Sequence, residues 1–124
     1  MNQNKYKIAV IDDETEILQM INRFLQKKDN YNVTTFSNPL NALDQVDSSF
    51  DLVLLDIMMP QMNGIEVLEK LLKKNPTQKV IMMTAYSTLD RVLKSHKNGA
   101  THYIMKPFES LMALENKIIE VLES

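Results

Sequence analysis

Short apolar runs alternate with amphipathic segments along the chain. Five runs have the length of β-strands, at Tyr6–Ile11, Val33–Phe36, Asp51–Leu55, Lys79–Met83 and His102–Met105. After each run, apolar residues recur three and four positions apart, which places them on one face of a helix. These helical patterns cover 17–25, 40–46, 65–72, 89–93 and 111–122. The alternation predicts a (βα)5 arrangement.

Strands that alternate with helices predict a parallel sheet, because right-handed crossovers place helices on both of its faces. The expected class is therefore a doubly wound, five-stranded α/β fold. Three runs are continuously apolar, as expected for strands covered on both faces, namely those at 6–11, 51–55 and 79–83. The run Val33–Phe36 contains two threonines and is expected at an edge of the sheet.

Three of the helical patterns begin with a recognisable capping residue. Asn38 is followed by Pro39, a pair that suits the N-cap and first position of a helix. Asn63 and Ser87 stand at the start of two later patterns. These residues predict where the second, third and fourth helices begin.

The composition bounds the function classes. With 124 residues, of which 44% are hydrophobic, the chain is expected to form a single domain over residues 1–124. The absence of cysteine excludes disulfides and thiolate metal sites. No apolar run approaches the ~20 residues that span a bilayer, and the start lacks a secretion signal, so we expect a cytoplasmic protein. A net charge of −2 gives no reason to expect direct binding to nucleic acid or to a membrane.

The residues that follow the apolar runs are the candidates for a functional site. In open α/β sheets, ligands bind beyond the carboxyl ends of the strands. Asp12 and Asp13 follow the first run and Asp56 follows the third. Thr84 follows the fourth run and Lys106 the fifth. We expect these five residues to converge at one edge of the sheet.

Each of these residues also has a simpler interpretation. Asp12 and Asp13 could cap a helix, and Asp56 could accept backbone N–H groups in a loop. Thr84 could be an ordinary turn hydroxyl and Lys106 a solvated side chain. Their shared position at one sheet edge favours a site over four unrelated features.

Three neighbouring carboxylates require a counter-charge. Each pair repels by ~4 kcal/mol at 4 Å and an effective dielectric constant near 20. One lysine does not offset this repulsion, so either a carboxyl is protonated or a dication binds among them. Mg²⁺ prefers such oxygen ligands and keeps positions open for a phosphate oxygen. The residues therefore predict a magnesium site that also receives phosphate.

Other phosphate chemistries fit the sequence poorly. Glycine-rich nucleotide and phosphate loops are excluded, because the only glycines are Gly64 and Gly99 and the first turn is acidic. An aspartyl phosphatase resembling the haloacid dehalogenases would need an acid two residues after Asp56, where Met58 stands. His96 and His102 lie apart from the strand ends and are expected to be surface residues.

On these motifs, the chain resembles the receiver domain of two-component response regulators, the CheY-like family. The matching residues, in order, are Asp12-Asp13, Asp56, Thr84-Ala85 and Lys106-Pro107-Phe108. The segments MPQMNG and NGATHYIMKPF also resemble family segments. The resemblance extends from about Lys7 to Leu122, so it implies a single receiver domain with a flavodoxin-like sheet in the order 2-1-3-4-5.

The resemblance implies a phospho-accepting signalling switch. Asp56 would take a phosphoryl group from the phosphohistidine of a histidine kinase. Asp13 and Asp56 would bind Mg²⁺ directly, together with the backbone carbonyl of Met58, and Asp12 would reach it through water. The implied partners are a sensor histidine kinase or phosphotransfer protein and a downstream target or attached output domain. A homodimer linked to phosphorylation is a further implied state.

The resemblance also implies a conformational response. Lys106 would pair with the phosphoryl oxygens and Asp56, and Thr84 would donate its hydroxyl to a phosphoryl oxygen. Tyr103 would turn inward once Thr84 moves, although an edge-strand tyrosine that simply packs on a helix is an equally good interpretation of the residue itself. The response would alter the face formed by the fourth helix, fifth strand and fifth helix.

Two positions of this chain bear on the lifetime of the phosphoryl group. Met58 stands two residues after Asp56, and Tyr86 stands two residues after Thr84. Such positions flank the attacking water in receiver domains, and neither side chain is an acid or amide that would orient it. We therefore expect a longer lifetime than in receivers that turn over quickly.

Two other functions stay open on the residues. The chain is not expected to be an enzyme with a small-molecule product, beyond assisting its own phosphorylation and dephosphorylation. An aspartyl-phosphate phosphatase or phosphotransferase would instead release phosphate over many turnovers. A degenerate receiver would serve only for binding.

Overall fold

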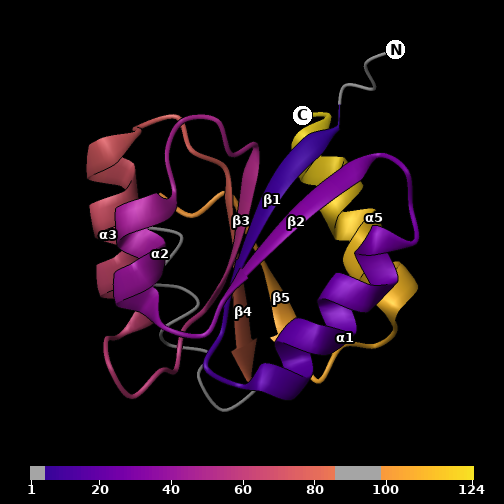
Figure 1. Ribbon diagram of the computed structural model, residues 1–124, viewed down its shortest axis with the longest axis horizontal. Helices are drawn as coiled ribbons and strands as arrows, with labels where there is room; N and C mark the ends of the chain where they lie inside the picture. Colours follow the sequence, from indigo (N-terminus) through magenta and orange to yellow (C-terminus); the bar gives the residue numbers. More distant parts are fainter. Residues whose placement is uncertain (1–4, 86–98) are drawn as a thin grey trace.

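The described residues of the computed structural model, 5–85 and 99–124, form a five-stranded parallel sheet in the order β2-β1-β3-β4-β5 (Figure 1). The strands are β1 (Tyr6–Ile11), β2 (Tyr31–Phe36), β3 (Leu52–Asp56), β4 (Val80–Ala85) and β5 (His102–Lys106). The helices are α1 (Thr15–Gln26), α2 (Pro39–Gln45), α3 (Gly64–Lys74) and α5 (Leu111–Leu122). The predicted class and strand order are confirmed. The helix expected over 89–93 and its start at Ser87 lie outside the described residues.

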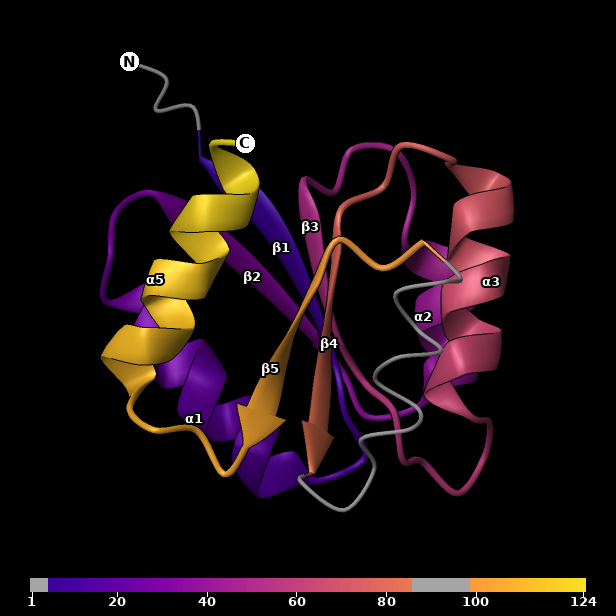
Figure 2. The same cartoon turned by 180° about the vertical axis from the view of Figure 1, so that it is seen from behind.

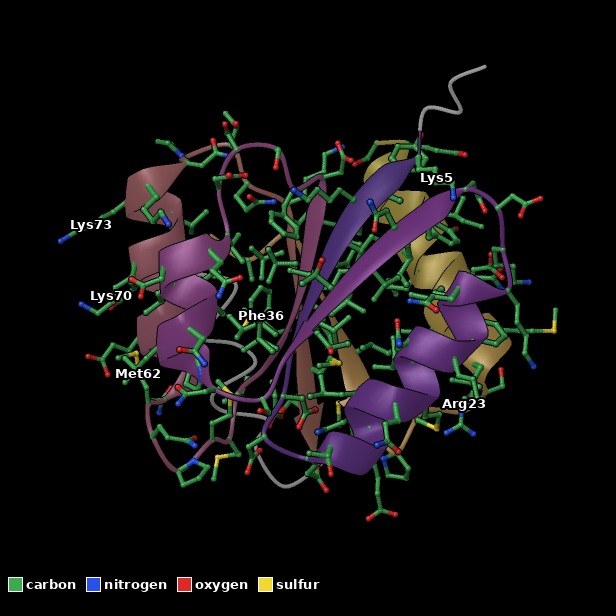
Figure 3. The ribbon with its side chains drawn as sticks, viewed as in Figure 1. Lys5, Arg23, Phe36, Met62, Lys70 and Lys73 are labelled. Carbon is green, nitrogen blue, oxygen red and sulfur yellow. The ribbon has the colours of Figure 1, made fainter. Side chains whose placement is uncertain are left out.

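Helices cover both faces of the sheet. Figures 1 and 2 show α2 and α3 on one face and α1 and α5 on the other. Each face has its own hydrophobic core, and Leu55 and Leu68 belong to one while Leu54 and Ile118 belong to the other. Figure 3 shows Lys70 pointing outward from the helical layer, as expected for the polar side of an amphipathic helix. Within residues 5–85 and 99–124, no helix is long and apolar enough to cross a membrane.

Four strands differ from the sequence prediction at their ends. β2 begins two residues earlier than expected, at the buried Tyr31. β3, β4 and β5 end at Asp56, Ala85 and Lys106, so the candidate polar residues belong to the strands rather than to the loops after them. The reason is that the backbone ladder continues past the apolar runs, since parallel pairing extends to the pair Ala85 and Lys106. As predicted, β2 is an edge strand.

Asparagine caps begin α2 and α3, as the sequence predicts. The Asn38 side chain accepts the N–H of Leu40 at 2.9 Å, and the Asn63 side chain accepts the N–H of Ile65 at 2.7 Å. The expected apolar face of α2 is partly wrong, because Leu40 is 52% exposed. The other two residues of the predicted face do face the core, because Val46 is buried and Leu43 packs against the same cluster, and Ala42 is fully buried beside them.

Polar side chains at the amino end of the sheet tie the strands to one another. The Asp51 carboxylate accepts the backbone N–H of Lys7 at 2.7 Å, and the Asp51 N–H donates to the Lys7 carbonyl at 2.8 Å. The buried side chain of Gln78 donates to the Phe50 carbonyl at 3.0 Å. Each of these contacts satisfies a backbone group where a strand begins.

Candidate functional site

Among the described residues, three carboxylates converge at the carboxyl end of the sheet. Oxygen atoms of Asp12, Asp13 and Asp56 all lie within 4.8 Å of one another. Asp12 is fully buried and Asp56 is 3% exposed, whereas Asp13 is partly exposed. The β1 ladder carries Asp12 into this position, because its N–H donates to the carbonyl of Phe36 at 3.1 Å.

The Lys106 ammonium lies against this cluster. Its Nζ is 2.9 Å from Oδ2 of Asp12, 3.1 Å from Oε1 of Glu14 and 3.3 Å from Oδ1 of Asp56. Its side chain is 12% exposed, so these charges interact in a partly desolvated setting. Glu14 was not singled out from the sequence. The acidic run from residue 12 to residue 14 hints at it, but only the path of the chain into α1 brings its side chain to Lys106.

Burial and mutual repulsion alter the acidity of the site. Desolvation, followed by the negative charge of Asp12, raises the pKa of Asp56 to about 7. Desolvation also raises the pKa of Asp12, although its hydrogen bonds oppose the shift. Burial acts to lower the pKa of Lys106, but its hydrogen bond with Asp12 and the nearby carboxylates outweigh burial and raise it. Lys106 therefore stays charged, while Asp56 takes up a proton more readily than an ordinary aspartate.

Asp12 has a second contact, with the backbone just before α1. Its Oδ1 accepts the N–H of Glu14 at 2.9 Å, and α1 begins at Thr15. Asp12 thus contacts the backbone before the helix with one oxygen and Lys106 with the other. The simpler interpretation of these aspartates as helix caps is wrong, because Glu14 is the N-cap residue of α1 and the helix has no side-chain cap.

The loop after β3 passes close to the acid end of the strand. The Gly64 N–H donates to the carbonyl of Ile57 at 2.8 Å. A Cβ at Gly64 would overlap the backbone carbonyl oxygen of Asp56 and the Cα of Ile57. Glycine is therefore needed here for close approach, and this contact fixes the start of α3 against the residue that carries the carboxylate.

Thr84 is fully buried near the end of β4. The strand register pairs Asp56 with Met83 and pairs Thr84 with Met105. Thr84 therefore occupies the strand adjacent to Asp56, at the same end of the sheet. The register thus places Thr84 and Lys106 on the two strands beyond Asp56, and a contact of the Thr84 hydroxyl with a group on Asp56 stays a prediction.

The remaining sequence candidates lie around the site or away from it. Met58, in the loop after β3, is 49% exposed, and Tyr103, on β5, is 36% exposed. His102 lies at the amino end of β5, where its Nε2 is 3.1 Å from Oε2 of Glu120, which agrees with the expectation that it stands apart. Two candidates are outside the described residues, Tyr86 and His96.

The donor set fits the implied Mg²⁺. Carboxylate oxygens are the ligands that Mg²⁺ prefers, and the three aspartates present them within 4.8 Å. The raised pKa of Asp56 also favours a bound cation, because the three aspartates carry more negative charge than the single ammonium of Lys106 balances. A dication would relieve that repulsion.

Comparison with known proteins identifies the class. A family model of the response regulator receiver domain matches residues 8–118. The chain therefore belongs to the response regulator receiver domain family, which comprises signalling modules of two-component systems.

Individual relatives agree with this assignment. The chain is 34% identical over 118 residues to the chemotaxis protein CheY of Listeria monocytogenes, covering 94% of this chain and 95% of that protein. It is 43% identical over 103 residues to the transcriptional regulatory protein CpxR of Escherichia coli K12, covering 82% of this chain. The chain spans 43% of the length of CpxR.

Solved structures show the same fold. The BeF3-activated receiver domain of DrrB, from Thermotoga maritima, superposes with a TM-score of 0.86 at 32% identity. The match covers 97% of this chain and 99% of that one.

Proposed function

We propose that this chain is a phospho-accepting switch of a two-component system, with Asp56 as the phosphoryl acceptor. A sensor histidine kinase or a phosphotransfer protein in the cytoplasm would supply the phosphoryl group. The observation that supports this proposal best is the position of Asp56, a buried carboxylate 3.3 Å from Lys106 and beside two further aspartates. The single receiver domain would span residues 1–124.

The residues of the site suit phosphoryl transfer. An oxygen of Asp56 would form a bond to phosphorus as the bond from phosphorus to the donor's histidine nitrogen breaks, and that nitrogen would keep the electron pair. Lys106 would stabilise the negative charge on the moving group, and Thr84 would donate its hydroxyl to it. Bound Mg²⁺, held by Asp13, Asp56 and the Met58 carbonyl, with Asp12 acting through water, would supply further neutralisation of charge.

The readout follows from the added charge. A phosphoryl group brings roughly two negative charges to a site that is already acidic. Thr84 and Lys106 would move toward it and alter the packing of β4 and β5, and Tyr103 would turn inward. The altered face would include β5 and α5 with the helix expected over 89–93. It would act on a downstream target, an attached output domain or a second copy of the chain.

Mass spectrometry of the intact protein tests the acceptor role. With Mg²⁺ and phosphoramidate, the wild type is expected to gain one phosphoryl group and the Asp56→Asn variant none. Asp51→Asn is the matched control, because Asp51 precedes the same strand at its opposite end and should leave the gain unchanged. Beryllofluoride with Mg²⁺ should shift the amide NMR signals of Thr84 and Tyr103 in the wild type and in Asp51→Asn but not in Asp56→Asn.

Other results would contradict the proposal. Release of phosphate over many turnovers from phosphoramidate would instead indicate a phosphatase or phosphotransferase. Absence of both the mass gain and the amide shifts in the wild type would indicate a receiver used only for binding.

Met58 and Tyr86 are proposed to lengthen the phosphoryl lifetime. The exposure of Met58 supports this, because water can reach its side chain and the thioether offers only a weak hydrogen-bond acceptor. Met58→Asn should accelerate the loss of phosphate in Mg²⁺, followed as the decay of the phosphorylated mass. An unchanged decay rate would contradict the role of Met58.

A further inference from the structure

Three carboxylates surround the Lys106 ammonium in the part of the chain that the structure describes. It donates hydrogen bonds to Asp12 at 2.9 Å and to Glu14 at 3.1 Å, and it forms an ion pair with Asp56, whose Oδ1 is 3.3 Å from Nζ. A phosphoryl oxygen that arrives at Asp56 therefore competes with these carboxylates for the N–H groups of Lys106.

The three carboxylates differ in how readily they can move. Asp12 is fully buried, and its second oxygen is held by the N–H of Glu14 at 2.9 Å. Asp56 is held in β3 and is itself the residue proposed to accept the phosphoryl group. The Glu14 side chain is 61% exposed, and within residues 5–85 and 99–124 it makes no capping hydrogen bond to α1. Water can solvate Glu14 as soon as it leaves Lys106, so it is the partner released most easily.

We propose that Glu14 is a positioning residue that occupies Lys106 in the resting state and releases it to the phosphoryl group on Asp56. The inference rests on the proposed function and adds a residue that sets the rate of phosphorylation. Glu14 holds back this step in two ways, because it keeps a donor of Lys106 occupied and places a negative charge at the mouth of the site. Exposed ion pairs of this kind correspond to effects of about two- to fivefold.

Three variants separate the contact from the charge. Glu14→Gln removes the charge, while Glu14→Asp keeps it but shortens the side chain by one methylene, so that it no longer reaches Lys106. Glu16→Gln is the control, because Glu16 is an exposed acid in the first turn of the same helix. With phosphoramidate and Mg²⁺, both Glu14 variants should be phosphorylated about two- to fivefold faster than the wild type. Glu16→Gln should match the wild type.

The resting contact has a readout that needs neither Mg²⁺ nor a phosphoryl donor. The ¹⁵N NMR signal of the Lys106 ammonium should be sharp in the wild type, because its protons are held by carboxylates. Faster exchange with water should broaden this signal in Glu14→Asp, less so in Glu14→Gln, whose amide oxygen still accepts a hydrogen bond from Lys106, and not in Glu16→Gln.

The outcomes distinguish this inference from the proposed function. If the wild type is phosphorylated at Asp56 but the Glu14 variants change neither the rate nor the ammonium signal, the role of Glu14 is overturned and the switch function stands. If Glu14→Asp behaves as the wild type, or Glu16→Gln accelerates phosphorylation equally, charge alone acts and the contact is overturned. If the wild type takes up no phosphoryl group, as with Asp56→Asn, the proposed function and the exchange at Lys106 both fall.

Discussion

Two aspartates lie at opposite ends of the central strand β3, Asp51 just before it and Asp56 as its last residue. Asp51 is exposed, and its carboxylate accepts a hydrogen bond from the backbone N–H of Lys7. The backbone N–H of Asp51 in turn donates to the carbonyl of Lys7. Asp56 is buried beside Asp12 and Asp13, and its pKa is raised to about 7. The same residue type is thus satisfied by the backbone at one end of the strand and opposed by like charges at the other.

The two ends of the strand contribute to stability with opposite signs. At the amino end, side chains such as Asp51 and Gln78 complete backbone hydrogen bonds and stabilise the fold. At the carboxyl end, ionised Asp56 destabilises the fold until a cation or a proton offsets its charge. The carboxyl end of the sheet should therefore be stabilised by a bound cation or proton, whereas the polar groups at the amino end already have partners.

The largest expected effect comes from neutralising the acid at the functional end. Asp56→Asn should raise the free energy of unfolding by about 3 kcal/mol at pH 8 without Mg²⁺, because it removes a desolvated charge while keeping the side-chain shape. Urea unfolding followed by circular dichroism measures this change.

The matched substitution at the amino end, Asp51→Asn, should lower the free energy of unfolding. Asp51→Asn weakens a charge-assisted bond to Lys7 but leaves an amide oxygen that still accepts it, so stability should fall by about 0.5 kcal/mol. If both variants destabilised the protein, the contrast between the two ends of the sheet would be wrong.

A change of pH is expected to have a smaller effect than Asp56→Asn. The folded-state pKa of Asp56, about 7, lies above the ordinary aspartate value of 3.8, so the folded state binds more protons than the unfolded state between these values. The contribution of Asp56 to stability should therefore fall as pH rises from 6 to 8, by about 1 kcal/mol. Urea unfolding at both pH values, as the difference between the wild type and Asp56→Asn, isolates this contribution.

Millimolar Mg²⁺ sharpens the same measurement. Binding to the folded state should stabilise the wild type and remove most of its loss between pH 6 and pH 8, because Asp56 then stays ionised beside a cation. Asp56→Asn should gain less from Mg²⁺. Equal gains in the two proteins would contradict a metal site that includes Asp56.

The fold was largely predictable because its pattern is local. Buried strands such as Leu52–Asp56 leave continuous apolar runs, and asparagine caps mark where α2 and α3 begin. The prediction failed where packing overrides pattern. Leu40 has the spacing of a core residue but is exposed, because α2 is short and is oriented by its contacts with the rest of the fold.

The site was predictable in its membership but less so in its pairing. Strand ends placed Asp12, Asp56 and Lys106 at one edge, as the structure has them. The contact of Glu14 with Lys106 depends on the path of the chain between β1 and α1, and periodicity carries no information about that path. The need for glycine at residue 64 likewise depends on a close approach of two backbone segments.

The strand register fixes how far each candidate site residue lies along the sheet. Asp56 is level with Met83, which is level with Ile104, so Thr84 stands one residue and Lys106 two residues further along their strands. At about 3.3 Å per residue, Thr84 and then Lys106 lie progressively further along the strand direction than Asp56. A group attached to Asp56 would extend in the same direction. An insertion of one residue in β4 would turn Thr84 to the opposite face as well as displace it. The spacing of these strands is therefore as much a part of the site as the side chains themselves.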